Sequence, residues 1–206
     1  MNAAIAFDPS GIDRLEKERS CVGCDLSGAN LSLKKLNGVN LSGANLKDAN
    51  LSLTRLIAAN LFQANLQGSL LQDTRLNEAN LSGANLLAAN MSNGRFNSAN
   101  LAGANFVRAN LSQSRFNSAN LSGANLMKAK MMGAHLNEAN FSGAQMQGAN
   151  LTNAKLKNVN LSGANLAQAN LTNVNLKDAV IKDTNFTGAI FCRTIMPDGE
   201  NNSGCK

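Results

Sequence analysis

The chain has 206 residues and a formal net charge of +6 at pH 7, and 44% of its residues are hydrophobic. Only 4% are aromatic, with no Trp and no Tyr, which argues against a conventional core of interlocking rings. No stretch of the sequence approaches the ~20 apolar residues of a membrane span, so no transmembrane helix is predicted. The positive charge permits contact with a polyanion without requiring one.

The first segment, residues 1–7, contains Ala4-Ile5-Ala6 directly before Phe7. This pattern is typical of the A-x-A end of an export signal, although no apolar h-region precedes it. Two interpretations stay open, namely the remnant of a processed export signal and an ordinary Ala-rich segment.

Residues 8–20 predict a short helix. Asp8 or Ser10 can cap its N-terminus, and Pro9 suits the first turn. Ile12 and Leu15 form an apolar face. We expect this helix to cover the first unit of the segment that follows, because an uncovered end of a repeat structure invites aggregation.

A five-residue repeat fills the middle of the chain. Every fifth residue from Leu26 to Phe191 is Leu, Met, Ile or Phe, at 34 consecutive positions, and the unit is Ala-Asn-Leu-x-x. A period of five fits neither a helix nor a strand, and five residues cannot bury a core alone, so the units must stack as a solenoid. Lys34 is the only misfit among the small residues. We expect a local distortion there, because a Lys head cannot be left unpaired in an interior.

A second period of twenty residues sets the shape of the coil. Segments like Leu-Ser-Gly-Ala-Asn recur at spacings of 20 or 40, with glycines such as Gly43 and Gly103 that suit corners of positive φ. Twenty residues are four pentapeptides, so the predicted fold is an all-β solenoid, a quadrilateral parallel β-helix over residues 21–196. It would have about eight turns, with neighbouring turns ~4.8 Å apart. Phe96 and Phe116 lie one turn apart and should stack inside.

The outward positions form four columns along the predicted rod. Three are mostly Asn, and stacked amides one strand apart can form hydrogen-bonded ladders. The fourth, which we name the cation column, contains Lys35, Arg55, Arg75, Arg95, Arg115, His135 and Lys155. Neighbouring charges there repel by about 0.8 kcal/mol in water, and Glu78 and Glu138 lie on the same face as possible relief. A solvated face and an anion-binding strip are both open interpretations.

A smaller apolar feature lies on another face. Leu87, Val107 and Met127 each follow an inward residue, so they should point outward one turn apart. We name them the contact stripe, because an apolar patch on a soluble protein often marks a contact site. The alternative is that three singly tolerated surface residues happen to align.

The C-terminal residues 197–206 and the four cysteines belong to the ends of the rod. Pro197-Asp198-Gly199 is a turn signal, and the tail should fold over the last coil. Cys21 and Cys24 lie at one end and Cys192 and Cys205 at the other, so only pairing within each end fits the rod. A four-Cys zinc site would need all four thiolates together. Disulfides, free thiols and a redox or metal role stay open. Disulfides favour the periplasm or the thylakoid lumen, with the cytoplasm as the alternative.

No catalytic constellation is found. The single histidine, His135, points outward in the cation column, and the six acids of residues 26–191 are scattered. There is no P-loop, and corners explain the glycines. We therefore expect no enzyme, no cofactor and no metal.

Residues 26–191 resemble the pentapeptide-repeat family, and this resemblance implies a right-handed quadrilateral β-helix. Both ends of the chain, with Cys21-Val22-Gly23-Cys24 at the start and Met196-Pro197-Asp198-Gly199 at the finish, look like those of cyanobacterial and chloroplast-lumen members. Most of the family has no established activity, and one branch protects DNA gyrase by imitating DNA. Such a mimic needs an acidic surface, whereas residues 26–191 contain 14 Lys and Arg against 6 Asp and Glu.

The predicted function is that of a non-catalytic structural or interaction protein, which presents flat faces to an unidentified protein partner. The alternative is a polyanion binder that uses the Lys35–Lys155 column, and a gyrase-directed DNA mimic is disfavoured by charge. The sequence shows no specific nucleic-acid signature, because single-strand binders add stacking aromatics and only Phe62 looks exposed. We expect a monomer.

Overall fold

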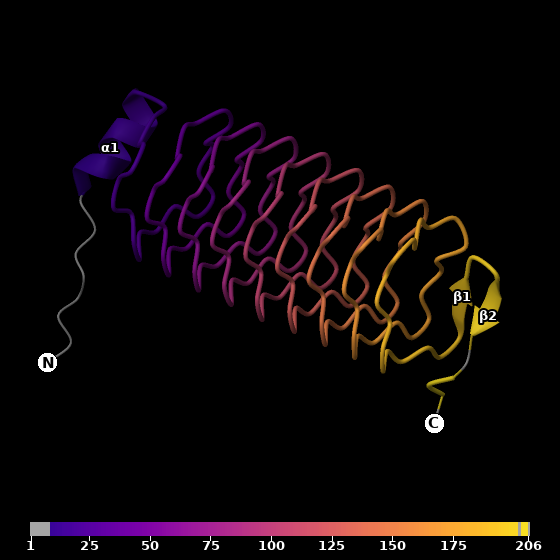
Figure 1. Ribbon diagram of the computed structural model, residues 1–206. Coiled ribbons are helices and arrows are strands. Elements are labelled where there is room, and N and C mark those ends of the chain that lie inside the picture. Colours follow the sequence, from indigo (N-terminus) through magenta and orange to yellow (C-terminus); the bar gives the residue numbers. More distant parts are fainter. Residues whose placement is uncertain (1–8, 202, 206) are drawn as a thin grey trace, which may run out of the picture.

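The computed structural model describes residues 9–201 and 203–205, and it forms one straight rod (Figure 1). Helix α1 (Pro9–Lys17) lies at one end. The other end has a hairpin of β1 (Thr194–Met196) and β2 (Gly199–Asn201). The export-signal pattern at Ala4-Ile5-Ala6 and the capping residue Asp8 lie outside the described residues.

Between these ends, the chain winds with a register of twenty residues. The residue before each large apolar residue pairs in parallel with its counterpart one turn later, from Ser20 with Asn40 to Asn175 with Ile195. Four such pairs occur per turn, so the coil has four sides, and each side is a stack of single bridges. The N–H of Leu101 donates to the carbonyl of Asn120 at 2.7 Å, and the same bond recurs along the rod. The register therefore agrees with the spacing read from the sequence.

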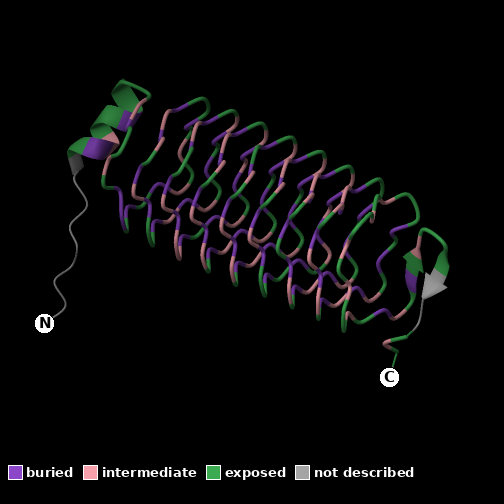
Figure 2. Cartoon of the chain, in the orientation of Figure 1, coloured by how far each residue is buried: buried purple, intermediate pink, exposed green. Residues whose placement is uncertain are grey.

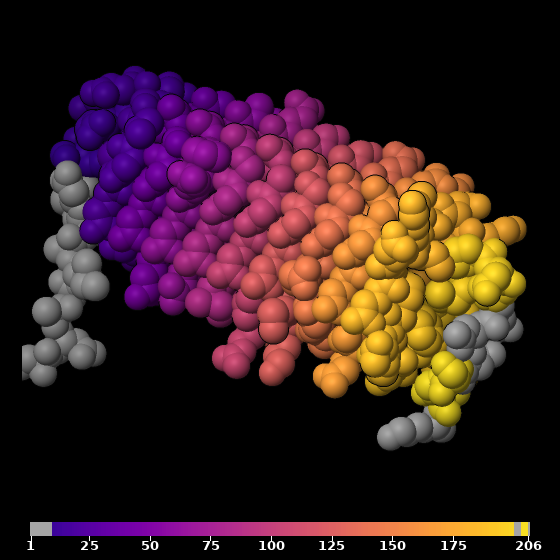
Figure 3. Space-filling model, in the orientation of Figure 1, coloured from indigo at the N-terminus to yellow at the C-terminus, as the bar shows by residue number. Residues whose placement is uncertain are grey.

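The interior is filled by alternating large and small side chains. The large apolar residues from Leu26 to Leu176 are buried, and the small residues between them are buried with few exceptions. Short purple segments therefore recur along the coils in Figure 2, between pink and green ones. The rings of Phe96 and Phe116 stack at 4.6 Å with 8° between their planes, as predicted. Successive coils pack directly on one another, so that Figure 3 shows them as adjoining bands.

The corners adopt the left-handed conformation in glycine and non-glycine residues alike. Gly43 and Gly103 have φ of 64° and 65° there, as the sequence suggested. Leu53 and Glu78, at 61°, occupy equivalent corners. A non-glycine residue costs about 1–2 kcal/mol in this conformation. The inter-coil hydrogen bonds outweigh that cost, so glycine is favourable at these corners without being required.

Asparagine side chains hold the corners and connect the coils. Oδ1 of Asn40 accepts the N–H of Ser42 at 3.1 Å, which caps the turn. The same oxygen accepts from Nδ2 of Asn60, one turn later, at 3.1 Å. This ladder continues to Asn160, and it confirms the stacked amides expected from the sequence. Asparagine therefore serves the fold on these sides.

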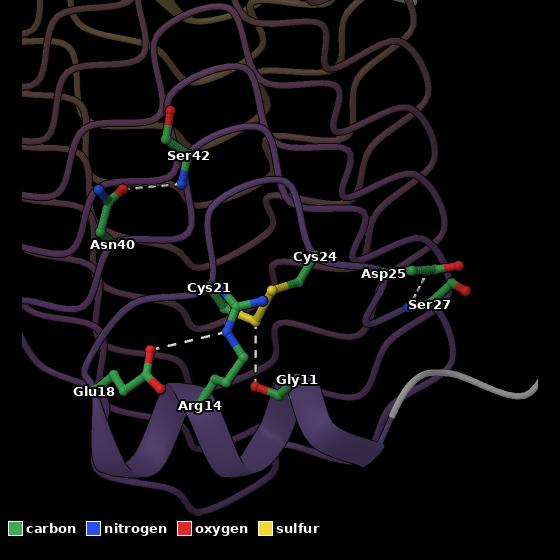
Figure 4. The surroundings of a disulfide bond; sticks show 9 residues. All are labelled: Gly11, Arg14, Glu18, Cys21, Cys24, Asp25, Ser27, Asn40 and Ser42. Atoms are coloured by element: carbon green, nitrogen blue, oxygen red, sulfur yellow. Dashed lines mark hydrogen bonds and ion pairs between the residues drawn. A yellow bond between two sulfur atoms is a disulfide. The ribbon is translucent and has the colours of Figure 1, made fainter.

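Helix α1 covers the first coil, and its range lies within the predicted 8–20. Leu15 is fully buried, and a Cβ added at Gly11 would lie 3.1 Å from Leu26. The disulfide between Cys21 and Cys24 faces the helix, and Sγ of Cys21 is 3.2 Å from the carbonyl oxygen of Gly11 (Figure 4). Since glycine lacks a side chain, the helix can approach the coil closely at this point.

The distortion expected at Lys34 is absent, and that prediction was wrong. The N–H of Arg55 donates to the carbonyl of Lys34 at 2.9 Å, so the ladder is continuous. Lys34 belongs to the first coil, next to α1, and its ammonium pairs with the carboxylate of Glu16 in that helix. The side chain thus reaches a partner at the end of the rod instead of entering the interior.

The C-terminal end is covered less completely. β1 and β2 pair antiparallel, a disulfide joins Cys192 to Cys205, and the N–H of Gly204 donates to the carbonyl of Phe191 at 2.8 Å. The tail thus returns to the last coil, as expected. Ile181 and Phe186, however, are only partly buried.

Gly94 provides a test of interior packing. A Cβ added there would lie 2.6 Å from Cε2 of Phe96, so we expect Gly94→Ala to lower the free energy of unfolding by about 1–3 kcal/mol. Urea denaturation followed by circular dichroism measures this. In a Phe96→Leu background the smaller side chain should make Gly94→Ala much less costly. An unchanged cost in that background would contradict the packing argument.

The C-terminal disulfide should hold the tail on the last coil. Its cysteines are 13 residues apart, and closing a loop of that size contributes about 3 kcal/mol. We expect Cys192→Ser with Cys205→Ser to expose the last coil first, because each coil of a solenoid contacts only its neighbours. Hydrogen exchange measures this as faster exchange confined to residues near 176–201. Equally faster hydrogen exchange along the whole rod would show that the disulfide does not stabilise the last coil specifically.

Candidate anion-binding face

The structure brings the whole cation column into one row. Parallel bridges connect Lys35 to Arg55 and continue turn by turn to His135 and Lys155. Adjacent members are therefore about 4.8 Å apart, and the seven positions extend over about 29 Å. Arg75 and His135 are half-buried, whereas the other five side chains are exposed.

No acid neutralises this row among the described residues. The two ion pairs there are Arg14 with Glu18 and Lys34 with Glu16, and neither includes a member of the column. Glu138, which the sequence suggested as relief, accepts a hydrogen bond from Oγ of Ser118 at 3.0 Å. Asp73 lines a groove together with Arg55 and Arg75 but forms no ion pair with them, and salt screens the remaining repulsion between the cations.

After four of the seven column positions, the corner is capped without the column side chain. On the other sides, Asn caps the N–H two residues later in its own turn. On the cation side, the acceptor for such an N–H is an Asn of the preceding turn. The N–H of Asn97 donates to Oδ1 of Asn77 at 3.2 Å, and the N–H of Asn117 donates to Oδ1 of Asn97 at 3.1 Å. Ile57 and Lys157 donate to the preceding turn in the same way. Capping therefore does not depend on the side chains of Arg55, Arg95, Arg115 or Lys155. At the other corners of this side, Ile57 offers no side-chain acceptor to Asn77, and Oδ1 of Asn117 has no hydrogen-bond partner.

A groove of about 390 Å³ runs along the N-terminal half of the column. It is lined by Leu33, Lys35, Leu53, Arg55, Asp73, Arg75, Asn93 and Arg95. Leu33 is 71% exposed and Leu53 is 54% exposed. Sequence reasoning missed these two leucines, although their spacing of twenty residues at corner positions was a usable signal. Charge and apolar surface thus lie side by side here.

His135 interrupts the charge of the column. Burial lowers the pKa of its imidazole, and Lys155 and Arg115 on either side lower it further. The imidazole is therefore protonated less readily than an ordinary histidine, which weakens the charge of the column between Arg115 and Lys155.

The contact stripe lies where the sequence placed it, on one side and one turn apart. The N–H of Ala88 donates to the carbonyl of Val107, and that of Arg108 to the carbonyl of Met127. Met127 is 38% exposed, but Leu87 and Val107 are half-buried. The exposed apolar surface is thus smaller than three outward side chains suggest, and a contact role for it stays a prediction.

The cysteines and acids do not converge. The two disulfides lie at opposite ends of the rod, Cys21 with Cys24 and Cys192 with Cys205. In the described part of the chain, no three His, Cys, Asp or Glu residues gather to hold a metal ion. Within the same residues, no helix has the length and apolar character that crossing a membrane requires.

Comparison with known proteins gives consistent matches. The family model for pentapeptide repeats matches residues 20–56, 59–97, 95–133, 129–163 and 160–196, in 8 copies. The structure of HetL, a pentapeptide repeat protein involved in heterocyst differentiation regulation in Nostoc sp. strain PCC 7120, is 28% identical with a TM-score of 0.58. That match covers 94% of this chain and 99% of HetL. No curated protein matches the chain.

Two further structures are less similar in shape. A pentapeptide repeat protein of the Arabidopsis thaliana thylakoid lumen is 29% identical with a TM-score of 0.26, covering 48% of this chain and 62% of that one. Full-length QnrB1, a plasmid-mediated fluoroquinolone resistance protein, is 18% identical with a TM-score of 0.36, covering 82% and 90%. Neither likeness carries a functional argument.

The lowered pKa of His135 predicts a pH dependence of stability. In the unfolded chain the imidazole has its ordinary pKa near 6.5, so below that pH the unfolded state binds a proton more readily than the folded state. Stability should therefore decrease as the pH falls from 7 to 5. We expect His135→Gln to lose less stability over this range than the wild type, as measured by urea denaturation at pH 7, 6 and 5. Equal losses of stability in the wild type and in His135→Gln would contradict a lowered pKa of His135.

Proposed function

Because the chain belongs to the pentapeptide-repeat family, we propose that it is a non-catalytic interaction protein whose cation column binds an acidic partner. The observation that carries this proposal is the row of cations that form no ion pair within the described residues, four of which stand where the corner is capped without them. If the column positions had only a structural role, Asn would suffice there, as it does on the other sides.

The geometry of the row favours an extended anionic partner. The coils fix the backbone of every member, so only side chains become ordered when a partner binds. Arg55, Arg75, Arg95 and Arg115 form an uninterrupted run. The guanidinium group binds carboxylate, sulfate and phosphate through two parallel hydrogen bonds, which suits a chain of repeated anionic groups.

The comparisons support binding rather than catalysis. HetL, similar over almost its entire length, is involved in a regulatory process. Imitation of DNA is disfavoured, because the cation column has the opposite sign of charge from a nucleic-acid backbone. QnrB1 shares the fold at 18% identity, which does not transfer its role.

We also propose an extracytoplasmic location, such as the periplasm or the thylakoid lumen. Two disulfides support it, because reducing compartments keep structural thiols reduced. Rapid alkylation of intact cells, followed by mass spectrometry, should find all four cysteines protected from the reagent. Four alkylated cysteines would place the protein in the cytoplasm instead.

The cation column should contribute more to anion binding than equal charge elsewhere. We expect Arg75→Gln with Arg95→Gln to weaken binding to heparin and to polyglutamate by about fivefold, because exposed ion pairs contribute about 0.2–1 kcal/mol each. Isothermal calorimetry at low salt measures both ligands. Lys47→Gln with Lys182→Gln removes the same charge from other places on the rod and should have little effect.

Lys157 is unsuitable as a reference residue, because it lies on the cation side and lines a cleft with Lys155. Equal losses of affinity in the two double variants would show that the column binds anions no better than other charged parts of the rod. A loss for heparin alone would exclude an acidic polypeptide as the partner.

A further inference from the structure

Two leucine side chains project from the cation side at positions that are unfavourable for leucine. Leu33 is 71% exposed and Leu53 is 54% exposed. Both have positive φ, 63° and 61°, a conformation that residues with a bulky side chain rarely adopt. The same column continues with polar residues and glycine, namely Asp73, Asn93, Gln113, Gly133, Asn153 and Asn173. Neither the backbone conformation of the corner nor contact with water therefore favours a leucine at positions 33 and 53.

These leucines line the groove of about 390 Å³ together with the first four cations of the column. Along one column the lining is Leu33, Leu53, Asp73 and Asn93, and along the other it is Lys35, Arg55, Arg75 and Arg95. Among the described residues, none of these four cations forms an ion pair with Asp73. The groove therefore combines an excess of positive charge with an apolar part in its first two coils.

The N-terminal edge of this side is closed to an additional strand. In the second coil, the carbonyls of Arg55 and Ile57 accept inter-coil hydrogen bonds from the coil before them. The equivalent carbonyls of the first coil, those of Lys35 and Asn37, accept from the guanidinium group of Arg19 instead, with Nη1 at 3.2 Å from the oxygen of Lys35. A partner on this side must therefore lie along the groove and contact its side chains.

We propose that the groove binds an extended, acidic segment of a protein partner that also carries apolar residues. The proposal rests on the proposed function, because the acidic residues of the segment would pair with the cation column. Successive side chains of an extended chain point to opposite sides, so one set can cover the leucines while the other set meets the arginines. The groove spans three inter-coil steps, about 14 Å, which about five extended residues cover.

The lining favours a polypeptide over other anionic ligands. The phosphate backbone of a nucleic acid offers negative charge without apolar side chains that could cover Leu33 and Leu53. An anionic membrane surface would bring Asp73 among headgroups of its own charge. A polypeptide can place an uncharged or basic residue opposite Asp73, and its carboxylates can accept two parallel hydrogen bonds from each guanidinium group.

The test uses the full chain labelled with ¹⁵N and two peptides capped at both ends, one of alternating Glu and Leu and one of alternating Glu and Ser. We expect saturable amide shifts centred on the groove, from Leu33 to Arg95. The leucine peptide should bind about tenfold more tightly than the serine peptide, because it can cover the two leucines. Equal affinities of the two peptides would overturn the proposal, as would shifts outside the groove.

A leucine variant gives the second part of the test. Asn93 adopts a φ of 58° in the same column, so Leu33→Asn with Leu53→Asn should fold as stably as the wild type in urea denaturation. This variant should bind the leucine peptide about tenfold more weakly and polyglutamate with unchanged affinity. Met127→Ser with Met132→Ser removes two exposed apolar side chains outside the groove and should change neither affinity. Unchanged binding of the leucine peptide to the leucine variant would contradict the proposal.

The two proposals fail with different results. If Arg75→Gln with Arg95→Gln leaves polyglutamate binding unchanged, the column is not the anion-binding face and both proposals are wrong. If that variant weakens polyglutamate binding but the leucine variant binds the leucine peptide like the wild type, only the apolar part of the groove is excluded. Phosphatidylglycerol vesicles that bind the wild type but not the leucine variant, without any peptide binding, would overturn the polypeptide in favour of a membrane surface.

Discussion

The main-chain hydrogen bond between coils twenty residues apart is the interaction on which the structure depends. Each side of a coil contributes only one bridge, so no side is stable alone, and order comes from repetition. The interior reinforces this bond, because a large and a small residue on each side fill the section without voids. Left-handed corners such as Leu53 are tolerated because the bonds around them are satisfied.

The sequence predicted the features that repetition controls, and it failed where neighbouring coils differ. The fifth-residue pattern located the interior, and the twenty-residue spacing located the cation column. Lys34 was misjudged because its partner Glu16 belongs to the cap, which has no repeat. Leu33 and Leu53 were missed because their twenty-residue spacing extends over only two coils, and the same column continues with Asp73 and Asn93.

On the cation side, the repetitive fold leaves side-chain positions that capping of the corners does not use. On the other sides, the asparagine side chain accepts an N–H of its own turn and bonds to the asparagine of the next turn. On the cation side, Asn77 and Asn97 instead accept the corner N–H of the following turn. The side chains of Arg55, Arg95, Arg115 and Lys155 are therefore not needed to cap these corners, so charged residues can occupy their positions without loss of that hydrogen bond.

The four-sided section has a consequence for how such a chain can change in length. An insertion or deletion of twenty residues adds or removes a whole coil and leaves every column aligned. A change of five residues also preserves the interior, because it keeps the apolar period, but it rotates all later coils by one side. Inserted between Arg75 and Arg95, one extra pentapeptide would divide the cation column between two adjacent faces. The rod would stay folded after this insertion, but it could no longer bind a single extended partner along one row of cations.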